Sequence, residues 1–352
     1  MITARHAFIF LIILTATLGS MTVLAVLFSL VTQLYRLVRL ERSLSLTMRE
    51  REPNRRLTSF RLTDPYAVPG LFRRGQLHAH TRESSRDASM PLADVIIAYR
   101  ELGYDFLAVT DHNHFFMPDD SPLPGFVLIP GSEDSYPWRW LGHHYLCLHS
   151  QVCQPRNRGN LRERFMSVTA AQGLVGLAHP SWRGGLGLGR WLPQDVPEVE
   201  APFLLEISSP YANSIRENTL LWHYLLNASP PRTVWAIATD DLHRQGGLNR
   251  GWVMVKTERL TAAAILDALR RGNFYASTGP DADFGVLNGA VFARTTAPCT
   301  IRFTDSRNCV RAAARAVDLA YVPRGDEGFI RVEAEDANGG TAWSQPFFLS
   351  PE

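Results

Sequence analysis

The chain has 352 residues, of which 45% are apolar, 20% are charged and 10% are aromatic. This composition excludes a disordered, collagen-like or coiled-coil protein, and a formal charge of only +2 gives no indication of a specific nucleic-acid partner. Four scattered cysteines are too few for a disulfide framework or a cysteine-rich zinc site.

The first predicted element is a membrane helix. Residues 7–35 contain no charged side chain, and a bilayer core is spanned by about 20 helical residues. We therefore expect a single-pass transmembrane anchor at residues 1–36, with a cleaved signal peptide as the alternative. Arginines are more numerous after this segment than before it, which favours a cytoplasmic body, although an exported body is also compatible. Residues 37–65 are arginine-rich and predict a juxtamembrane linker.

Between residues 66 and 280, short apolar runs of strand length alternate with helix-like segments. The runs lie at residues 106–110, 126–129, 145–148, 174–178, 203–207 and 234–238, and the helix-like segments at residues 91–102, 160–172, 213–227 and 261–271. Such alternation is typical of a parallel sheet covered by helices. It predicts an α/β domain, and it fits a barrel and an open sheet alike. Residues 281–352 read as strands separated by turns and predict a small antiparallel β module.

Histidines and carboxylates stand where several of these strands end. His78 and His80 lie two residues apart, so both rings of an extended segment can reach one metal ion, whereas the plain alternative is two exposed histidines on a strand edge. Mixed nitrogen and oxygen donors suit Mn²⁺, Fe²⁺ or Zn²⁺, and about nine such groups are too many for one ion. The remaining candidates are Asp87, His112, Glu133, one of His143 and His144, His179, Asp241 and His243.

In these stretches the sequence resembles the PHP (polymerase and histidinol phosphatase) superfamily of metal-dependent hydrolases. The matching motifs occur in the family's order, and two later stretches resemble the branch named for carbamate ester hydrolases. The family motifs are LHAHT (77–81), ELGYDFLAVTDHN (101–113), IPGSE (129–133), GLAHP (176–180) and DDLH (240–243), and the branch-like stretches are LRRGNFYASTGP (269–280) and AWSQPF (342–347).

The resemblance implies a distorted (β/α)₇ barrel that holds three divalent ions. His144 is preferred to His143 because it directly precedes an apolar strand. By motif, the first ion is held by His78, His80, Glu133 and Asp241, the second by Glu133, His144 and His179, and the third by Asp87, His112 and His243.

The same resemblance implies hydrolysis of a small-molecule phosphate mono- or diester by a hydroxide that bridges two ions. Two alternatives are hydrolysis of a carbamate or carboxylic ester on the same ions, and a scaffold whose metals are structural. Arg82, Arg183 and Arg244 adjoin the ligand motifs and can bind phosphate, unless they are ordinary surface arginines. His114 is a candidate proton donor to the leaving group. Residues 184–189 are glycine-rich and fit either a rim that shapes access or a plain loop.

Overall fold

The computed structural model describes residues 23, 24, 27, 28, 31, 56–119, 123–137, 142–149, 159–184, 188–229 and 232–352. Most of the predicted anchor, residues 7–35, lies outside these residues. Across the described part of the chain, none of the helices combines the length and apolar composition that a bilayer crossing requires. This finding contradicts the prediction of a single-pass membrane protein with a cytoplasmic body.

The described strands form two sheets. The smaller has the strand order β5-β6-β7-β8-β9, and the larger has the path β1-β17-β15-β16-β11-β10-β2-β3-β4, with β12, β13 and β14 joined to it. The strands of the smaller sheet are β5 (Gly131–Tyr136), β6 (His143–Leu148), β7 (Leu174–Leu177), β8 (Phe203–Ser208) and β9 (Val234–Ala238). Those of the larger sheet are β1 (Phe60–Leu62), β2 (Leu71–Gln76), β3 (Phe106–Ala108), β4 (Val127–Ile129), β10 (Trp252–Thr257), β11 (Phe274–Ser277), β12 (Ala282–Leu287), β13 (Ala290–Asp305), β14 (Val310–Tyr321), β15 (Phe329–Glu335), β16 (Thr341–Trp343) and β17 (Phe347–Pro351).

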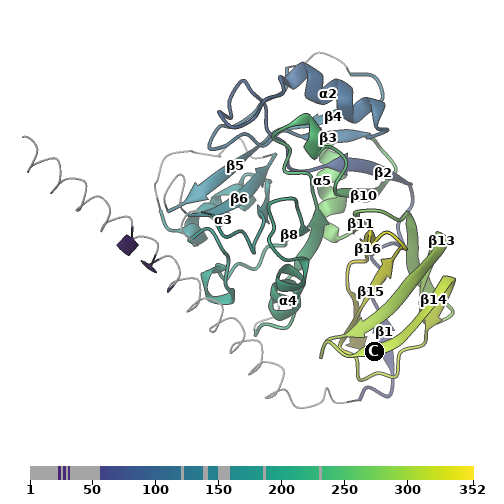
Figure 1. Cartoon of the computed structure of the whole chain (residues 1–352). Helices are drawn as coiled ribbons and strands as arrows, with labels where there is room; N and C mark the ends of the chain where they lie inside the picture. Colours follow the sequence, from purple (N-terminus) through teal and green to yellow (C-terminus); the bar gives the residue numbers. More distant parts are fainter. Residues whose placement is uncertain are drawn as a thin grey trace, which may run out of the picture.

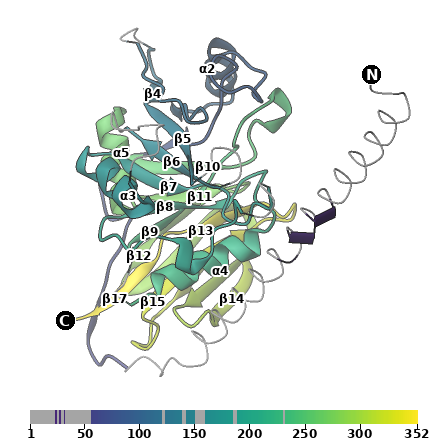
Figure 2. The same cartoon turned by 90° about the vertical axis from the view of Figure 1, so that its left-hand side faces the viewer.

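All four predicted helices of the body are confirmed, within one or two residues at their ends. They are α2 (Leu92–Glu101), α3 (Leu161–Ala170), α4 (Ile215–Leu226) and α5 (Ala262–Arg271), and two 3₁₀ turns occur at Pro193–Asp195 and Gln245–Gly247. Helix α5 begins where the sequence predicts because the Thr261 hydroxyl accepts a hydrogen bond from Ala264 N. In Figures 1 and 2, α2 lies at one end of the molecule and the long β13–β14 hairpin at the other.

The prediction of a distorted (β/α)₇ barrel is wrong, because the strands form two sheets that do not close on each other. β5 pairs antiparallel with β6, and β6 pairs antiparallel with β7, so these neighbours lack the parallel pairing that a (β/α) barrel requires around its whole ring. At the far edge, β9 has no strand partner beyond β8 in the sheet order. At this edge the buried side-chain amide of Gln345 pairs with the backbone of β9. It accepts a hydrogen bond from Ala236 N over 2.9 Å and donates one to Ala236 O over 2.8 Å.

Two apolar cores lie on opposite faces of the smaller sheet. On β6, Leu146 and Leu148 belong to a core shared with residues of β3, β4 and β10 from the larger sheet. Tyr145 and Cys147 belong to a second core, which also holds residues of α3 and α4. Because side chains of a strand alternate between faces, this division decides which residues of β6 and β8 point between the sheets.

Candidate metal centre

The segment that carries His78 and His80 continues β2 and lies between the ends of β3 and β9. Thr110 N donates to Ala79 O over 2.8 Å, and His80 N donates to Leu242 O over 2.9 Å. A parallel bridge also pairs Ala79 with Leu242. The segment is therefore held extended from both sides, and its two histidine rings face the same way, with 3.1 Å between their Nε2 atoms.

Four donor groups converge around these rings. Asp241 Oδ1 lies 3.2 Å from Nε2 of both His78 and His80. Glu133 places Oε1 3.5 Å from His78 Nε2 and Oε2 3.5 Å from His80 Nε2. Two ligands of one tetrahedral ion, each about 2.1 Å from it, lie about 3.4 Å apart. The spacing of these side chains therefore fits a shared divalent ion, and His78, His80 and Glu133 have no exposed surface.

Glu133 also contacts a second pair of histidines. Its Oε1 atom lies 3.0 Å from His144 Nδ1 and 2.9 Å from His179 Nε2. The other ring nitrogens, His144 Nε2 and His179 Nδ1, are buried and have no hydrogen-bond partner within the described part of the chain. Buried polar atoms normally have partners, so these orphaned nitrogens indicate that the site is built for a further group.

A third set of donors lies at the outer side of the cluster. His112 Nε2 and His243 Nε2 are 3.4 Å apart, and they lie 3.3 Å and 3.5 Å from Asp87 Oδ2. These three distances also match the separation of ligands around one ion. The six residues between His80 and Asp87 thus form a loop long enough to bring Asp87 back to the cluster.

The charges of the cluster are set by mutual contacts. Burial lowers the pKa of His112, but the Glu133 carboxylate and a hydrogen bond with Asp87 outweigh this and raise it to about 10. Burial and the adjacent His112 ring lower the pKa of His80 to about 3. Burial also opposes ionisation of Glu133 and Asp241, yet the surrounding imidazoles hold the pKa of each carboxyl below its ordinary value. Divalent metals require ionised carboxylates and neutral imidazoles, so a bound ion would displace the proton that the raised pKa keeps on His112.

Glu206 supports the cluster from β8 and was missed by the sequence analysis. Its Oε1 lies 2.7 Å from His78 Nδ1 and accepts from the Thr239 hydroxyl at 2.7 Å, while its Oε2 accepts from His179 N at 2.6 Å. A carboxylate on the second ring nitrogen fixes the orientation of a metal-binding histidine and increases its basicity. The signal was present as a single carboxylate within the apolar run FLLEI (203–207).

Asp111 has the same supporting role on the other side. Its carboxylate accepts hydrogen bonds from Thr81 N, from the Thr81 hydroxyl and from the Ser85 hydroxyl, at 2.7 Å, 2.7 Å and 2.8 Å. Ser85 Oγ in turn accepts from His112 N and lies 3.2 Å from His80 Nδ1. This network fixes the loop that leads from His80 towards Asp87.

Two cluster residues have backbone angles that side chains rarely adopt. His179 has a φ of 28° and Asp241 a φ of 44°. Such conformations cost free energy and persist where the surrounding structure holds them. Here the hydrogen bond from His179 N to Glu206 supplies one such restraint, and the two conformations place His179 Nε2 2.9 Å from Glu133 Oε1 and Asp241 Oδ1 3.2 Å from His80 Nε2.

The neighbouring His143 is turned away from the cluster. Its ring stacks on Trp191 with 4.4 Å between centroids, and its Nε2 lies 4.0 Å from Asp195 Oδ2. Because His144 and His143 are adjacent on β6, only one of them can share the inner face with Leu146. The structure brings His144 to Glu133 and places His143 on the outer face.

The other predicted site residues lie at the surface. Arg183 is 3.6 Å from Glu217 Oε1, so its guanidinium already has an acidic partner. Arg82, Arg244 and His114 are exposed, and the contacts found for His114 in the described residues include its backbone bond to Asp111 O. Of the predicted rim at residues 184–189, residues 185–187 lie outside the described residues.

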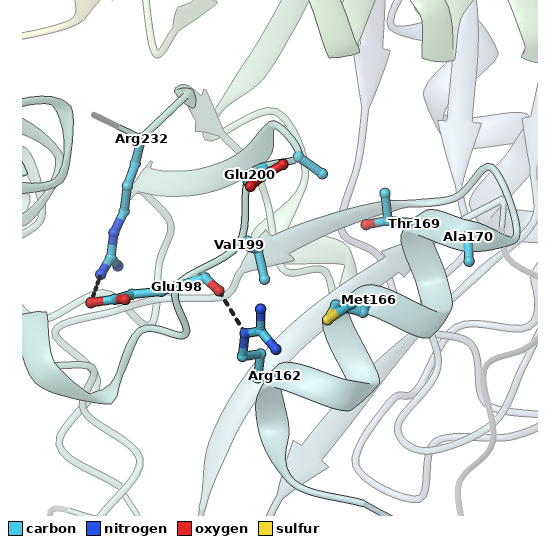
Figure 3. Close-up of a pocket in the computed structure, with 9 residues that line it drawn as sticks. Arg162, Met166, Thr169, Ala170, Glu198, Val199, Glu200 and Arg232 are labelled. Carbon is cyan, nitrogen blue, oxygen red and sulfur yellow. Dashed lines mark hydrogen bonds and ion pairs between the residues drawn. The ribbon is translucent and has the colours of Figure 1, made fainter. Parts of the chain in front are cut away.

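A hollow of about 760 Å³ lies at the opposite end of β8 and β9, beside α3 (Figure 3). Glu198 stands between its two arginines: Arg162 Nε donates to Glu198 O over 3.0 Å, and Arg232 Nη2 lies 3.7 Å from Glu198 Oε1. None of the predicted site residues lines it. Both of its arginines already contact Glu198, and the residues predicted to carry chemistry gather at the cluster instead.

Comparisons with known proteins leave the family open. No family model and no curated protein matches the chain. Among solved structures, a two-domain protein from Bacteroides vulgatus, described as containing a predicted PHP-like metal-dependent phosphoesterase, is 14% identical, with a TM-score of 0.43 over 85% of this chain and 91% of that one. PsfC from Pseudomonas syringae is 12% identical, with a TM-score of 0.41 over 57% of this chain and 88% of that one. Likenesses at this level carry no argument about function.

Proposed function

We propose that the chain is a metal-dependent hydrolase of phosphate mono- or diesters, of the PHP type that its motifs resemble. The observation that carries the proposal is the convergence of five histidines, His78, His80, His112, His144 and His179, on one buried carboxylate, Glu133. A purely structural metal site needs only one set of about four ligands, whereas this cluster offers three adjacent sets, two of which share Glu133.

The proposed ligand sets follow from the donor distances and from the motifs. Glu133 belongs to two sets because its two oxygens face different histidines. His78, His80, Glu133 and Asp241 would hold one ion, Glu133, His144 and His179 a second, and Asp87, His112 and His243 a third. The mixed donors suit Mn²⁺, Fe²⁺ or Zn²⁺.

When bound, neighbouring divalent ions supply Lewis acidity and a water that is ionised near neutral pH. The chain's own residues do the remaining work. Glu206 orients His78, and the exposed guanidiniums of Arg82 and Arg244 would bind phosphate oxygens through paired N–H donors. His114 remains the proposed proton donor to the leaving alcohol.

The first test strips the protein with a chelator, restores Mn²⁺ and measures turnover of nitrophenyl phosphate, bis-nitrophenyl phosphate and nitrophenyl acetate. We expect metal-dependent hydrolysis of at least one phosphate ester. Preference for the acetate would support the carbamate or carboxylic ester alternative. Full metal occupancy without turnover of a broad phosphoester panel would support the scaffold alternative.

Two adjacent histidines provide a matched pair of variants. His144→Gln removes a proposed ligand, and His143→Gln changes a ring that stacks on Trp191 away from the cluster. We expect His144→Gln to lose most of the turnover and part of the bound metal, while His143→Gln retains both. Equal effects of the two substitutions would contradict the ligand assignment.

A further inference from the structure

Solvent reaches the cluster from one side. His78, His80 and Glu133 have no exposed surface, whereas the Asp87 side chain is 51% exposed and those of His112 and His243 are each 10% exposed. A substrate therefore approaches across the set formed by Asp87, His112 and His243. Side chains that border this set are the ones that can contact the part of the substrate that points outward.

Tyr211 stands at this opening. It follows the end of β8 in a turn in which Ala212 N donates to Ser209 O over 3.0 Å. The Tyr211 ring meets the His243 ring at 70° with 5.1 Å between centroids, yet 41% of the residue is exposed. An ordinary phenol is uncharged at neutral pH. An uncharged aromatic surface thus lies at the mouth of a strongly polar cluster.

A second aromatic side chain of the described residues, Trp182, already packs within the cluster. The Trp182 ring packs against His144 and His179, with centroid distances of 4.9 Å and 5.3 Å. Gly184 and Gly189 approach it so closely that a Cβ at these positions would lie 1.9 Å and 2.2 Å from indole atoms. Trp182 therefore packs against the two histidines and positions them, and among the described residues we take Tyr211 as the aromatic group that can meet a ligand.

We propose that Tyr211 is a specificity-determining residue that stacks on a planar aromatic group in the alcohol part of the phosphoester. This inference rests on the proposed function, because it places the phosphate at the cluster. The Tyr211 ring contacts the His243 ring, so a phosphate held at the set formed by Asp87, His112 and His243 leaves its ester group next to Tyr211. A tyrosine loses little conformational freedom on stacking, and aromatic pairs gain affinity beyond the area that they bury.

The experiment compares two phosphonates that cannot be hydrolysed, phenylphosphonate and methylphosphonate, by calorimetric titration of the Mn²⁺-loaded protein. We expect wild type to bind phenylphosphonate about three- to tenfold more tightly than Tyr211→Ala does, as for an ordinary aromatic pair. Methylphosphonate should bind both proteins equally. Tyr211→Phe should keep the phenyl preference because stacking needs no hydroxyl.

Ile215→Ala is the matched control, because Ile215 is an exposed apolar residue four positions further along the chain. It should bind both phosphonates as wild type does. In turnover, Tyr211→Ala should raise KM for aryl phosphates and leave kcat nearly unchanged, as expected for a uniform binding contact.

A phenyl preference that survives in Tyr211→Ala, or is absent from wild type, would overturn the inference. If wild type then still hydrolyses phosphate esters, the proposed function stands without it. If neither phosphonate binds and no phosphate ester is hydrolysed, the proposed function and the inference both fail.

Discussion

The carboxylate of Glu206 provides a sharp test of the metal centre, because it touches no proposed ion. It lies 2.7 Å from His78 Nδ1 and accepts a hydrogen bond from His179 N at 2.6 Å, so it restrains two proposed ligands at once. Glu206→Gln keeps the size of the side chain but removes its charge and one of its two acceptor oxygens.

Loss of such an outer partner typically weakens metal affinity by about 10- to 100-fold, which corresponds to about 1.4–2.7 kcal/mol. The same range is expected for hydrogen bonds to a charged acceptor, at about 1.5–3 kcal/mol. Because Glu206 is fully buried, water cannot replace the lost contacts. We therefore expect the upper half of the range.

The assay is competition between the metal-free protein and a fluorescent chelator for Mn²⁺ or Zn²⁺. Glu198→Gln is the matched control, because the Glu198 side chain is 74% exposed at the far end of β8. We expect wild-type affinity in the control and weakened affinity in Glu206→Gln. Affinities of Glu206→Gln and wild type within twofold of each other would refute the view that Glu206 orients the ligands.

Three further predictions follow from buried polar groups. His78→Ala and Asp241→Asn should each abolish turnover while the protein stays folded, as checked by kinetics and circular dichroism; wild-type rates in either variant would contradict the assignment. Burial raises the pKa of Asp134 from 3.8 to about 6, so the native metal-free protein binds a proton that the unfolded chain releases, and stability falls as pH rises from about 4 to about 6. The free energy of unfolding of the wild type should fall by about 3 kcal/mol between pH 3.5 and pH 7, as measured by chemical denaturation, and Asp134→Asn should remove this fall. If the free energy of unfolding depends on pH in the same way in both proteins, the prediction is wrong. Gln345→Ala leaves both backbone groups of Ala236 without the amide that pairs with them, and urea titration should show a loss of about 2–5 kcal/mol, whereas a loss below 1 kcal/mol would mean that water replaces the amide.

Local signals in the sequence predict the helices well. Helix α2 begins after a proline and ends before Gly103, which has a φ of 76° that favours glycine. Strand β5 was missed because its sequence, GSEDSY, has no apolar run. Its polar groups are satisfied locally, since the Ser132 hydroxyl donates to Asp134 over 3.0 Å. Hydrophobic patterning cannot detect a strand whose inward residue is a buried carboxylate such as Glu133.

The candidate site was predictable where spacing alone brings residues together, as for His78 and His80. The choice between His143 and His144 needs the face of β6, which depends on the core that Leu146 joins. Glu206 was not predicted because a single acidic residue in an apolar strand gives no indication of its partner. That partner, His78, lies 128 positions earlier in the chain.

The gap between the two sheets lies at the cluster. This explains why the predicted closed barrel is wrong although the strand ends still converge. A closed barrel would pair backbone groups all around its ring. Here an isolated bridge between His112 and Glu133 joins the end of β3 to strand β5. Asn113, which has a φ of 50°, also donates a hydrogen bond from its backbone N to Glu133 O over 2.7 Å. Because few ladder bonds cross this gap, the backbone there can adopt the bends that turn imidazoles from both sheets onto one carboxylate. A regular ladder through His112 would alternate its side chains between the two faces and could not direct them all inward.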